Sequence, residues 1–270
     1  MSHSILVLDS GLGGLSICQP ILALKQNIQL VYFADDAYFP YGLLASDTLS
    51  DRVQDVIAEM LAFHQPDLVI LACNTVSTLL LPALRAKFDI PFVGVVPAIK
   101  PAARQSTTKK IGLLATPATV NREYTDDLIR DHAGDCEVVR VGSSELVLQA
   151  ERLLAGEGVD SALIEVVVSE FIEPDNGVQV DTVVLGCTHF PFLKSELEKV
   201  LPGINWVDSG SAIANRVLDL LSRKEGRNSE IFKGAHQIYF SKNKPDEHTL
   251  STVLRNVGIL SYQLHRFNVS

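Results

Sequence analysis

Two segments of similar pattern, DLVILACNT (67–75) and DTVVLGCTH (181–189), decide the fold. Each begins with an aspartate, continues through a mainly apolar run, and ends in a cysteine followed by polar residues. Apolar runs without a polar alternation are typical of strands buried on both faces of a parallel sheet. The residues after such a strand lie at the carboxyl edge of the sheet, where open α/β folds bind ligands. The two segments therefore predict an α/β protein whose site is built from strand ends.

Six further runs of the same kind predict more buried strands. They are SILVLD (4–9), QLVYFAD (29–35), FVGVV (92–96), KIGLLA (110–115), EVVRV (137–141) and INWVDS (204–209). The segments between them favour helices; in 49–64 one stripe is apolar and the opposite face carries charged residues, Arg52 among them. Alternating strands and helices indicate α/β architecture with right-handed crossovers.

The two halves of the chain also resemble each other. SILVLDSGLGG pairs with KKIGLLATPAT, DLVILACNT with DTVVLGCTH, and FVGVVPAI with INWVDSGSAI. The equivalent cysteines, Cys73 and Cys187, stand 114 residues apart. We interpret this as one α/β unit used twice, and two such units facing each other would form a cleft.

Composition restricts the class of protein. The 270 residues are 47% hydrophobic, enough for one large core or two smaller ones. A formal net charge of -9 without a basic run argues against nucleic acid or an anionic membrane as a partner. The segment 1–14 lacks the cationic start of a signal peptide, and the uncharged stretch 68–84 is shorter than the roughly 20 residues of a membrane span. We expect a cytoplasmic protein with free thiols.

Cys73 and Cys187 are the candidate chemical groups. A buried cysteine often serves as a small hydrophobic residue, and we interpret Cys18 and Cys136 in that way. A thiol between a strand end and a helix N-terminus is favoured as thiolate, which acts as a base or nucleophile. One thiol in each of two facing domains can remove a proton from one face of a carbon acid and return a proton to the other.

Polar residues accompany both thiols. His189 follows Cys187 by two residues and could tune its thiol, and Asp9 could do the same for Cys73. Asn74, Thr75 and Thr188 could hold a carboxylate, but they could equally be plain helix caps.

Other chemistries lack their motifs. SGLGGLS (10–16) does not give the G-x-G-x-x-G of dinucleotide-binding folds, and a phosphate-binding G-x-x-x-x-G-K-[ST], a zinc-type ligand spacing and G-x-S-x-G are absent. Spacing does not exclude a pyridoxal lysine, but no lysine stands at these strand ends. We expect neither a cofactor nor a metal.

Five motifs resemble those of the glutamate racemases in the cofactor-independent aspartate/glutamate racemase superfamily. They are LDSGLGGLS (8–16), YFADDAYFPYG (32–42), ACNTVS (72–77), VGVVPAIKPA (93–102) and LGCTHFP (185–191). The resemblance covers nearly the whole chain. It implies interconversion of L- and D-glutamate without pyridoxal phosphate, with D-glutamate supplied to peptidoglycan synthesis.

The resemblance also assigns roles to residues. Cys73 and Cys187 would be the acid/base groups on opposite faces of the α-carbon, and Asp9 and His189 would assist them. Glu151 resembles an additional acidic residue near the second thiol, although it lies on a helical pattern that would also suit a solvated carboxylate. The implied substrate contacts are Asp9, Ser10, Tyr41, Gly42, Asn74, Thr75, Thr188 and His189.

The implied fold has two similar, pseudo-symmetric α/β domains with mainly parallel sheets and the active site between them. The first domain would comprise residues 1–97 and 208–270, including HQIYFSKN (236–243), and the second residues 98–207. Ala34 and Phe39 depart from the family pattern and put the detailed contacts of their loop in question. Because the chain begins at its first strand, whereas relatives activated by a peptidoglycan precursor carry an N-terminal extension, we expect no such activation. We expect a homodimer.

Three alternatives stay open. An aspartate racemase of the same superfamily would share the two thiols. A non-catalytic amino-acid-binding module would share the two lobes but would not need paired thiols. An additional role as an inhibitor of another enzyme has no signature in the sequence.

Overall fold

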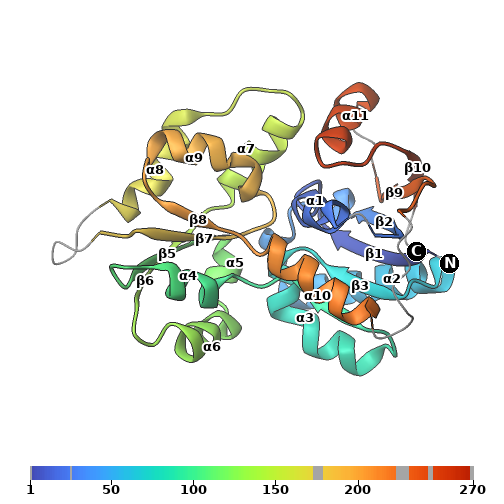
Figure 1. The fold of residues 1–270 in the computed structure, drawn as a ribbon, viewed down its shortest axis with the longest axis horizontal. Coiled ribbons are helices and arrows are strands. Elements are labelled where there is room, and N and C mark those ends of the chain that lie inside the picture. The colour runs from blue at the N-terminus through green and yellow to red at the C-terminus, as the bar shows by residue number, and fades with distance from the viewer. Residues whose placement is uncertain (1, 25, 173–178, 223–230, 243–245, 268–270) are drawn as a thin grey trace.

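The computed structural model describes residues 2–24, 26–172, 179–222, 231–242 and 246–267. It forms two lobes, each built around its own parallel sheet (Figure 1). The strands of the first lobe are β1 (His3–Asp9), β2 (Ile28–Ala34), β3 (Leu68–Leu71), β4 (Phe92–Gly94), β9 (His236–Phe240) and β10 (Tyr262–Arg266). The strands of the second lobe are β5 (Lys110–Ala115), β6 (Glu137–Gly142), β7 (Thr182–Gly186) and β8 (Asn205–Val207).

Helices connect these strands and cover both sheets. In the first lobe they are α1 (Leu15–Ala23), η1 (Asp36–Tyr38), η2 (Tyr41–Leu43), α2 (Ser46–His64), α3 (Asn74–Lys87), α10 (Gly210–Ser222) and α11 (Glu247–Asn256). In the second lobe they are α4 (Ile99–Gln105), α5 (Pro117–Val120), α6 (Glu123–His132), α7 (Glu145–Leu154), α8 (Ser161–Val168), η3 (Ser169–Phe171), η4 (Phe190–Leu193) and α9 (Lys194–Val200).

The first sheet is buried on both faces. Successive residues of β1 point into different cores, Ile5 and Val7 into one and Leu6 and Leu8 into the other. Helices α1, α10 and α11 contribute to the first of these cores, and α2 and α3 to the second. This double burial explains why the strand sequence has no polar alternation.

The second sheet is packed in the same way. Leu114 of β5 faces the helices α7, α8 and α9, and its neighbour Leu113 faces α4, α5 and α6. The strand order β6-β5-β7-β8 repeats the order β2-β1-β3-β4 of the first sheet. Strands β3 and β7 therefore occupy equivalent positions in the two sheets. Strand β3 lies next to β1, and β7 lies next to β5.

The predicted fold class is confirmed. All eight apolar runs form strands, every strand pairing is parallel, and the chain has two α/β lobes of repeated topology. The helix predicted over 49–64 begins slightly earlier, at Ser46. The structure adds β9 and β10 to the edge of the first sheet, next to β2. The exact domain boundaries stay a prediction.

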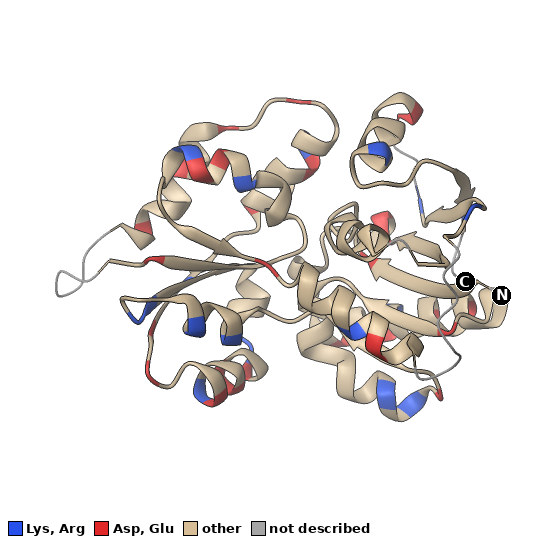
Figure 2. Cartoon of the chain, in the orientation of Figure 1, with Lys and Arg blue, Asp and Glu red and all other residues tan. Residues whose placement is uncertain are grey.

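Charged residues of both signs are interleaved on the outer helices of both lobes (Figure 2). Helices α6 and α9, for example, carry acidic and basic residues on the same few turns. The described helices include none with both the length and the apolar character needed to cross a membrane.

Candidate active site

Side chains from the carboxyl ends of the two sheets meet between the lobes. The Thr188 hydroxyl, after β7, donates a hydrogen bond of 3.0 Å to the carboxylate of Asp9, the last residue of β1. The Ser16 hydroxyl, in the first turn of α1, donates to the carbonyl oxygen of Thr188 over 2.7 Å. The site is therefore formed by both lobes together, as the paired strand ends predicted.

The glycines after β1 allow this close approach. A Cβ atom on Gly11 would lie 2.5 Å from Oε1 of Glu151, and one on Gly13 would clash with the ring of His189. The Gly11 N–H donates to Asp9 over 3.0 Å. The glycine-rich turn thus packs against side chains of the opposite lobe, which gives it a physical role unrelated to binding a dinucleotide.

Cys187, His189 and Glu151 form a connected row. The sulfur of Cys187 lies 3.8 Å from Nδ1 of His189, and Nε2 of that ring lies 2.7 Å from Oε1 of Glu151. Burial opposes protonation of His189, but its hydrogen bonds to Cys187 and Glu151 prevail and raise the pKa of its ring well above the usual value. Burial also opposes ionisation of Glu151, yet the bond to His189 lowers the pKa of this carboxyl. The row therefore favours an imidazolium beside Cys187 and a carboxylate behind it.

Cys73 has the opposite surroundings. It stands at the N-terminal end of α3, where the N–H groups of Val76 and Thr75 favour a thiolate. Burial and the negative charge of Asp9 outweigh them and raise the pKa of the Cys73 thiol far above its usual value. The favourable helix N-terminus expected from the sequence is present, but desolvation is the larger effect on the pKa of Cys73. The charge of Cys187 also raises the pKa of Cys73, so the two sulfurs lie within electrostatic range of each other.

Asp9 acts on Cys73 through its charge. Its carboxylate is fully buried and accepts hydrogen bonds from Gly11 and Thr188. Burial raises the pKa of Asp9, although the positive charge of His189 and these two hydrogen bonds oppose the rise. Asp9 therefore joins the two lobes through its bond to Thr188, and its charge acts on both Cys73 and His189.

Polar groups between the lobes provide neutral donors. The side-chain nitrogen of Asn74 is buried without a hydrogen-bond partner among the described residues. The hydroxyl of Thr75 lies 3.1 Å from that of Thr116 and 3.4 Å from that of Thr119. The interpretation of Asn74 and Thr75 as helix caps is wrong, because Cys73 occupies the cap position and α3 begins at Asn74.

Sequence reasoning missed Thr116 and Thr119. Thr116 directly follows β5 and caps α5, and a Cβ atom on Gly42 would lie 3.2 Å from the Cβ atom of Thr116. The signal was present in the sequence: KIGLLAT ends as the other strands do, with a polar residue at the carboxyl edge.

The remaining predicted contacts come from the loops after β1 and β2. Ser10 and Tyr41 are buried, but the hydroxyl of Tyr41 donates to Asp35 over 2.7 Å. Phe39, a departure from the family pattern, places its ring 5.7 Å from the ring of His189. The loop therefore contacts the histidine of the opposite lobe.

The other two cysteines lie apart from this site. All four cysteines are free thiols; Cys18 lies on the buried face of α1, and Cys136 is partly exposed beside Asp135. The described residues contain no group of three or more His, Cys, Asp or Glu side chains placed to hold a metal ion.

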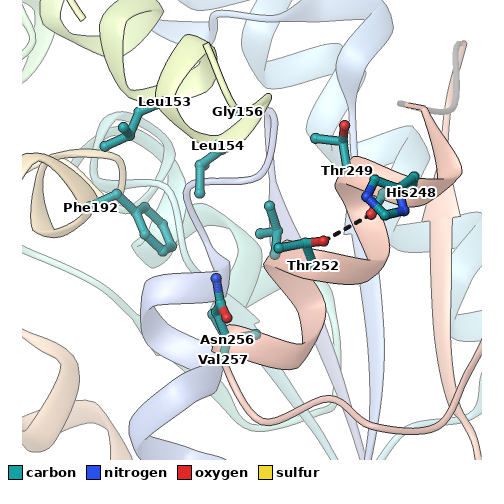
Figure 3. Close-up of a pocket in the computed structure, with 10 residues that line it drawn as sticks. Leu153, Leu154, Gly156, Phe192, His248, Thr249, Thr252, Asn256 and Val257 are labelled. Carbon is teal, nitrogen blue, oxygen red and sulfur yellow. Dashed lines mark hydrogen bonds between the residues drawn. The ribbon is translucent and has the colours of Figure 1, made fainter. Parts of the chain in front are cut away.

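Cavities lie both near the site and farther from it. A small one of about 10 Å³ borders Asn74, Cys187 and Thr188 but is not lined by Cys73 or Asp9. A wider cavity of about 480 Å³ lies elsewhere, between the end of α7 and α11 (Figure 3). It contains none of the predicted site residues, although Leu153 and Leu154 in its wall follow Glu151 on α7.

Comparison with known proteins agrees with this geometry. A model of the Asp/Glu/hydantoin racemase family matches residues 23–217. The glutamate racemase of Vibrio campbellii is 44% identical over 263 residues, which cover 97% of this chain and 96% of that protein; that of Aliivibrio fischeri is 44% identical over 97% of both. The crystal structure of Escherichia coli glutamate racemase with L-glutamate and the activator UDP-MurNAc-Ala has a TM-score of 0.89 at 40% identity and covers 100% of both chains. The chain therefore belongs to the Asp/Glu/hydantoin racemase family and, within it, to the glutamate racemases.

Proposed function

We propose that this chain interconverts L- and D-glutamate by two-base proton transfer without pyridoxal phosphate, with Cys73 and Cys187 as the two acid/base groups. The observation that carries the proposal is that thiols from equivalent strand ends of the two lobes stand in one interlobe site with opposite electrostatic surroundings.

The surroundings suit the two thiols to complementary roles. Cys187, whose sulfur lies 3.8 Å from Nδ1 of His189, can take the α-proton from one enantiomer. Cys73, with its raised pKa, holds its proton and can deliver it to the opposite face of the carbanionic carbon. The reverse reaction begins with Cys73 as thiolate and Cys187 as thiol.

Neutral donors suit a substrate with two carboxylates. The unpartnered amide of Asn74 and the hydroxyls of Thr75, Thr116 and Thr119 can donate to carboxylate oxygens without adding a titratable group. Such donors allow an acidic protein to bind a dianion, because a local hydrogen bond outweighs a distant, screened charge. The relatives named above favour glutamate over the alternative, aspartate.

The test is racemisation in deuterated water by the wild type, Cys73→Ser and Cys187→Ser. Each variant should racemise glutamate roughly a thousandfold more slowly while still exchanging the α-proton of one enantiomer, a different one in each variant. Normal racemisation by both variants would contradict the two-thiol mechanism. Deuterium incorporation into aspartate alone would favour aspartate racemase. Binding without exchange would favour an amino-acid-binding module.

The cellular role follows from the same proposal. D-glutamate made in the cytoplasm would supply peptidoglycan synthesis, and the homodimer expected from the sequence stays a prediction that light scattering can check. Assays of the chain with and without UDP-MurNAc-Ala, the activator in the Escherichia coli structure, measure whether this precursor changes the rate of racemisation.

A further inference from the structure

We propose that Arg52, on α2, is a positioning residue that fixes the loop 35–44 so that Tyr41 and Gly42 line the substrate cleft. The inference rests on the proposed function, because it assigns to that reaction a residue that does not itself reach the cleft. In the sequence, Arg52 falls on the charged face of the helix predicted over 49–64, where a solvated side chain would be expected.

Arg52 binds the first residue of the loop with two hydrogen bonds. Its Nε donates to Oδ2 of Asp35 over 2.9 Å and a terminal nitrogen donates to Oδ1 over 2.6 Å. The Arg52 side chain is 10% exposed and that of Asp35 is completely buried. A bidentate pair with so little solvent has a fixed geometry, which a lysine cannot reproduce.

The Arg52–Asp35 pair also contacts two tyrosines farther along the loop, Tyr38 and Tyr41. The guanidinium carbon of Arg52 lies 4.5 Å from the centre of the Tyr38 ring, a cation–π contact. Oδ2 of Asp35 also accepts the hydroxyl hydrogen bond of Tyr41 over 2.7 Å. Arg52 therefore constrains the loop at three points along its length.

The constrained loop forms one wall of the site. The N–H of Asp35 donates to the carbonyl oxygen of Asp9 over 2.9 Å. Phe39 contacts the ring of His189, and Gly42 packs beside Thr116 of the opposite lobe. If the loop shifts, the wall of the site that faces Thr116 moves with it. Cys73 and Cys187 stay in place, because they follow β3 and β7, which lie outside the loop.

The experiment compares Arg52→Lys with the matched control Arg85→Lys. Arg85 is an exposed residue of α3 in the same lobe, and it donates to the carbonyl oxygen of Phe92 over 2.9 Å, away from the loop. Arg52→Lys should raise the KM for glutamate about tenfold in both directions and change kcat less than about threefold. The reason is that the substitution disturbs the loop that binds the substrate but leaves the two thiols in place. Hydrogen–deuterium exchange of residues 36–44 should accelerate in Arg52→Lys and stay at the wild-type rate in Arg85→Lys.

Two outcomes would overturn the proposal. One is an unchanged KM together with unchanged exchange in the loop; the other is a lower kcat and melting temperature with an unchanged KM, which would show a merely structural role. If Arg52→Lys does not fold, Tyr41→Phe removes the hydroxyl bond to Asp35 and should accelerate exchange of residues 36–44; an unchanged exchange rate there would overturn the proposal. KM does not discriminate in this variant, because Tyr41 is itself a predicted substrate contact. A wild type that fails to racemise glutamate would contradict the proposed function, whereas the exchange measurement would still decide the role of Arg52 in the loop.

Discussion

At the scale of single residues, the two thiols are chemically different although their strands are equivalent. Cys187 has a cationic neighbour in His189, which is itself held by Glu151. Cys73 has an anionic neighbour in Asp9 and is more affected by burial than by its helix N-terminus. Matching positions in a repeated topology therefore do not have matching charged neighbours, and the neighbours of each thiol come from its own lobe and loops.

The His189–Glu151 pair predicts a pH-dependent stability. The pKa of Glu151 is lowered from 4.5, so its stabilising contribution is present above that pH and is lost on acidification. The pKa of His189 is raised from 6.5, so its contribution is complete below that pH and is lost as the pH rises through the folded-state value. Glu151→Gln should therefore cost most between these two values, about 2 kcal/mol near pH 6.

Thermal unfolding of wild type and Glu151→Gln across pH 5 to 10 measures this effect. The difference in melting temperature should narrow at alkaline pH, where His189 loses its proton. A difference that stays constant with pH would mean that Glu151 contributes only packing.

Gly13 provides a test of the close approach between the lobes. A methyl group there would meet the buried ring of His189, so Gly13→Ala should displace that ring from Cys187. We expect kcat to fall roughly a hundredfold, the range found when one acid/base partner is misplaced. Gly158→Ala is the control, because a Cβ atom at Gly158 meets nothing within 4 Å. Equal kinetics in the two variants would contradict the predicted clash.

At the scale of elements, Ser77 connects α3 to the carboxyl ends of two strands. Its hydroxyl donates to the carbonyl oxygen of Leu71 over 2.8 Å and accepts the N–H of Val95 over 3.0 Å, with no solvent exposure. Ser77→Ala removes both bonds, but the Val95 N–H still donates to the Leu71 carbonyl oxygen over 3.0 Å, so the substitution should cost about 1 kcal/mol. Urea denaturation measures this loss in the free energy of unfolding.

The control is Ser251→Ala, which removes an exposed bond to the carbonyl oxygen of His248. It should lower the free energy of unfolding much less than Ser77→Ala does. Equal losses in the two variants would contradict the role of Ser77.

The strands of both sheets were predictable because double burial leaves a mark in the sequence. The four residues 5–8 of strand β1 are all apolar, since their alternate side chains enter two cores. Strand β10, YQLHR, lies at the edge of the first sheet and is partly exposed, so its polar composition gives no such signal.

Candidate site residues were predictable where they follow a strand, as Asp9, Cys73 and Cys187 do. Arg52 was not recognisable, because its partner Asp35 reaches it only after the loop and α2 have folded together. Periodicity locates the face of a helix, but it does not show what packs against that face.

At the scale of the whole molecule, hydrogen bonds hold the two lobes together where the candidate site lies between them. Hydrogen bonds cross from lobe to lobe at Leu12 to Glu151, Ser16 to Thr188 and Thr188 to Asp9. We therefore infer that these bonds stabilise the closed arrangement, in which the two lobes enclose the substrate.

Ser16 allows this inference to be tested without altering a predicted substrate contact. Its hydroxyl donates to the carbonyl oxygen of Thr188 over 2.7 Å and so joins the lobes only when they are closed. Ser16→Ala should weaken closure by about 1 kcal/mol, which raises KM about fivefold because the closed state binds the substrate. Steady-state kinetics in both directions measure the change.

The control for Ser16→Ala is Ser169→Ala. Ser169 donates an equally short bond, 2.7 Å, to the carbonyl oxygen of Val166 within the second lobe. Ser16 and Ser169 both donate to a backbone carbonyl, but only the Ser16 bond joins the two lobes. Removing the Ser169 bond should therefore leave KM unchanged. If both variants raise KM equally, the effect comes from loss of a hydroxyl anywhere in the chain and closure does not depend on the Ser16 bond. If neither variant raises KM, the other bonds between the lobes suffice to hold them closed.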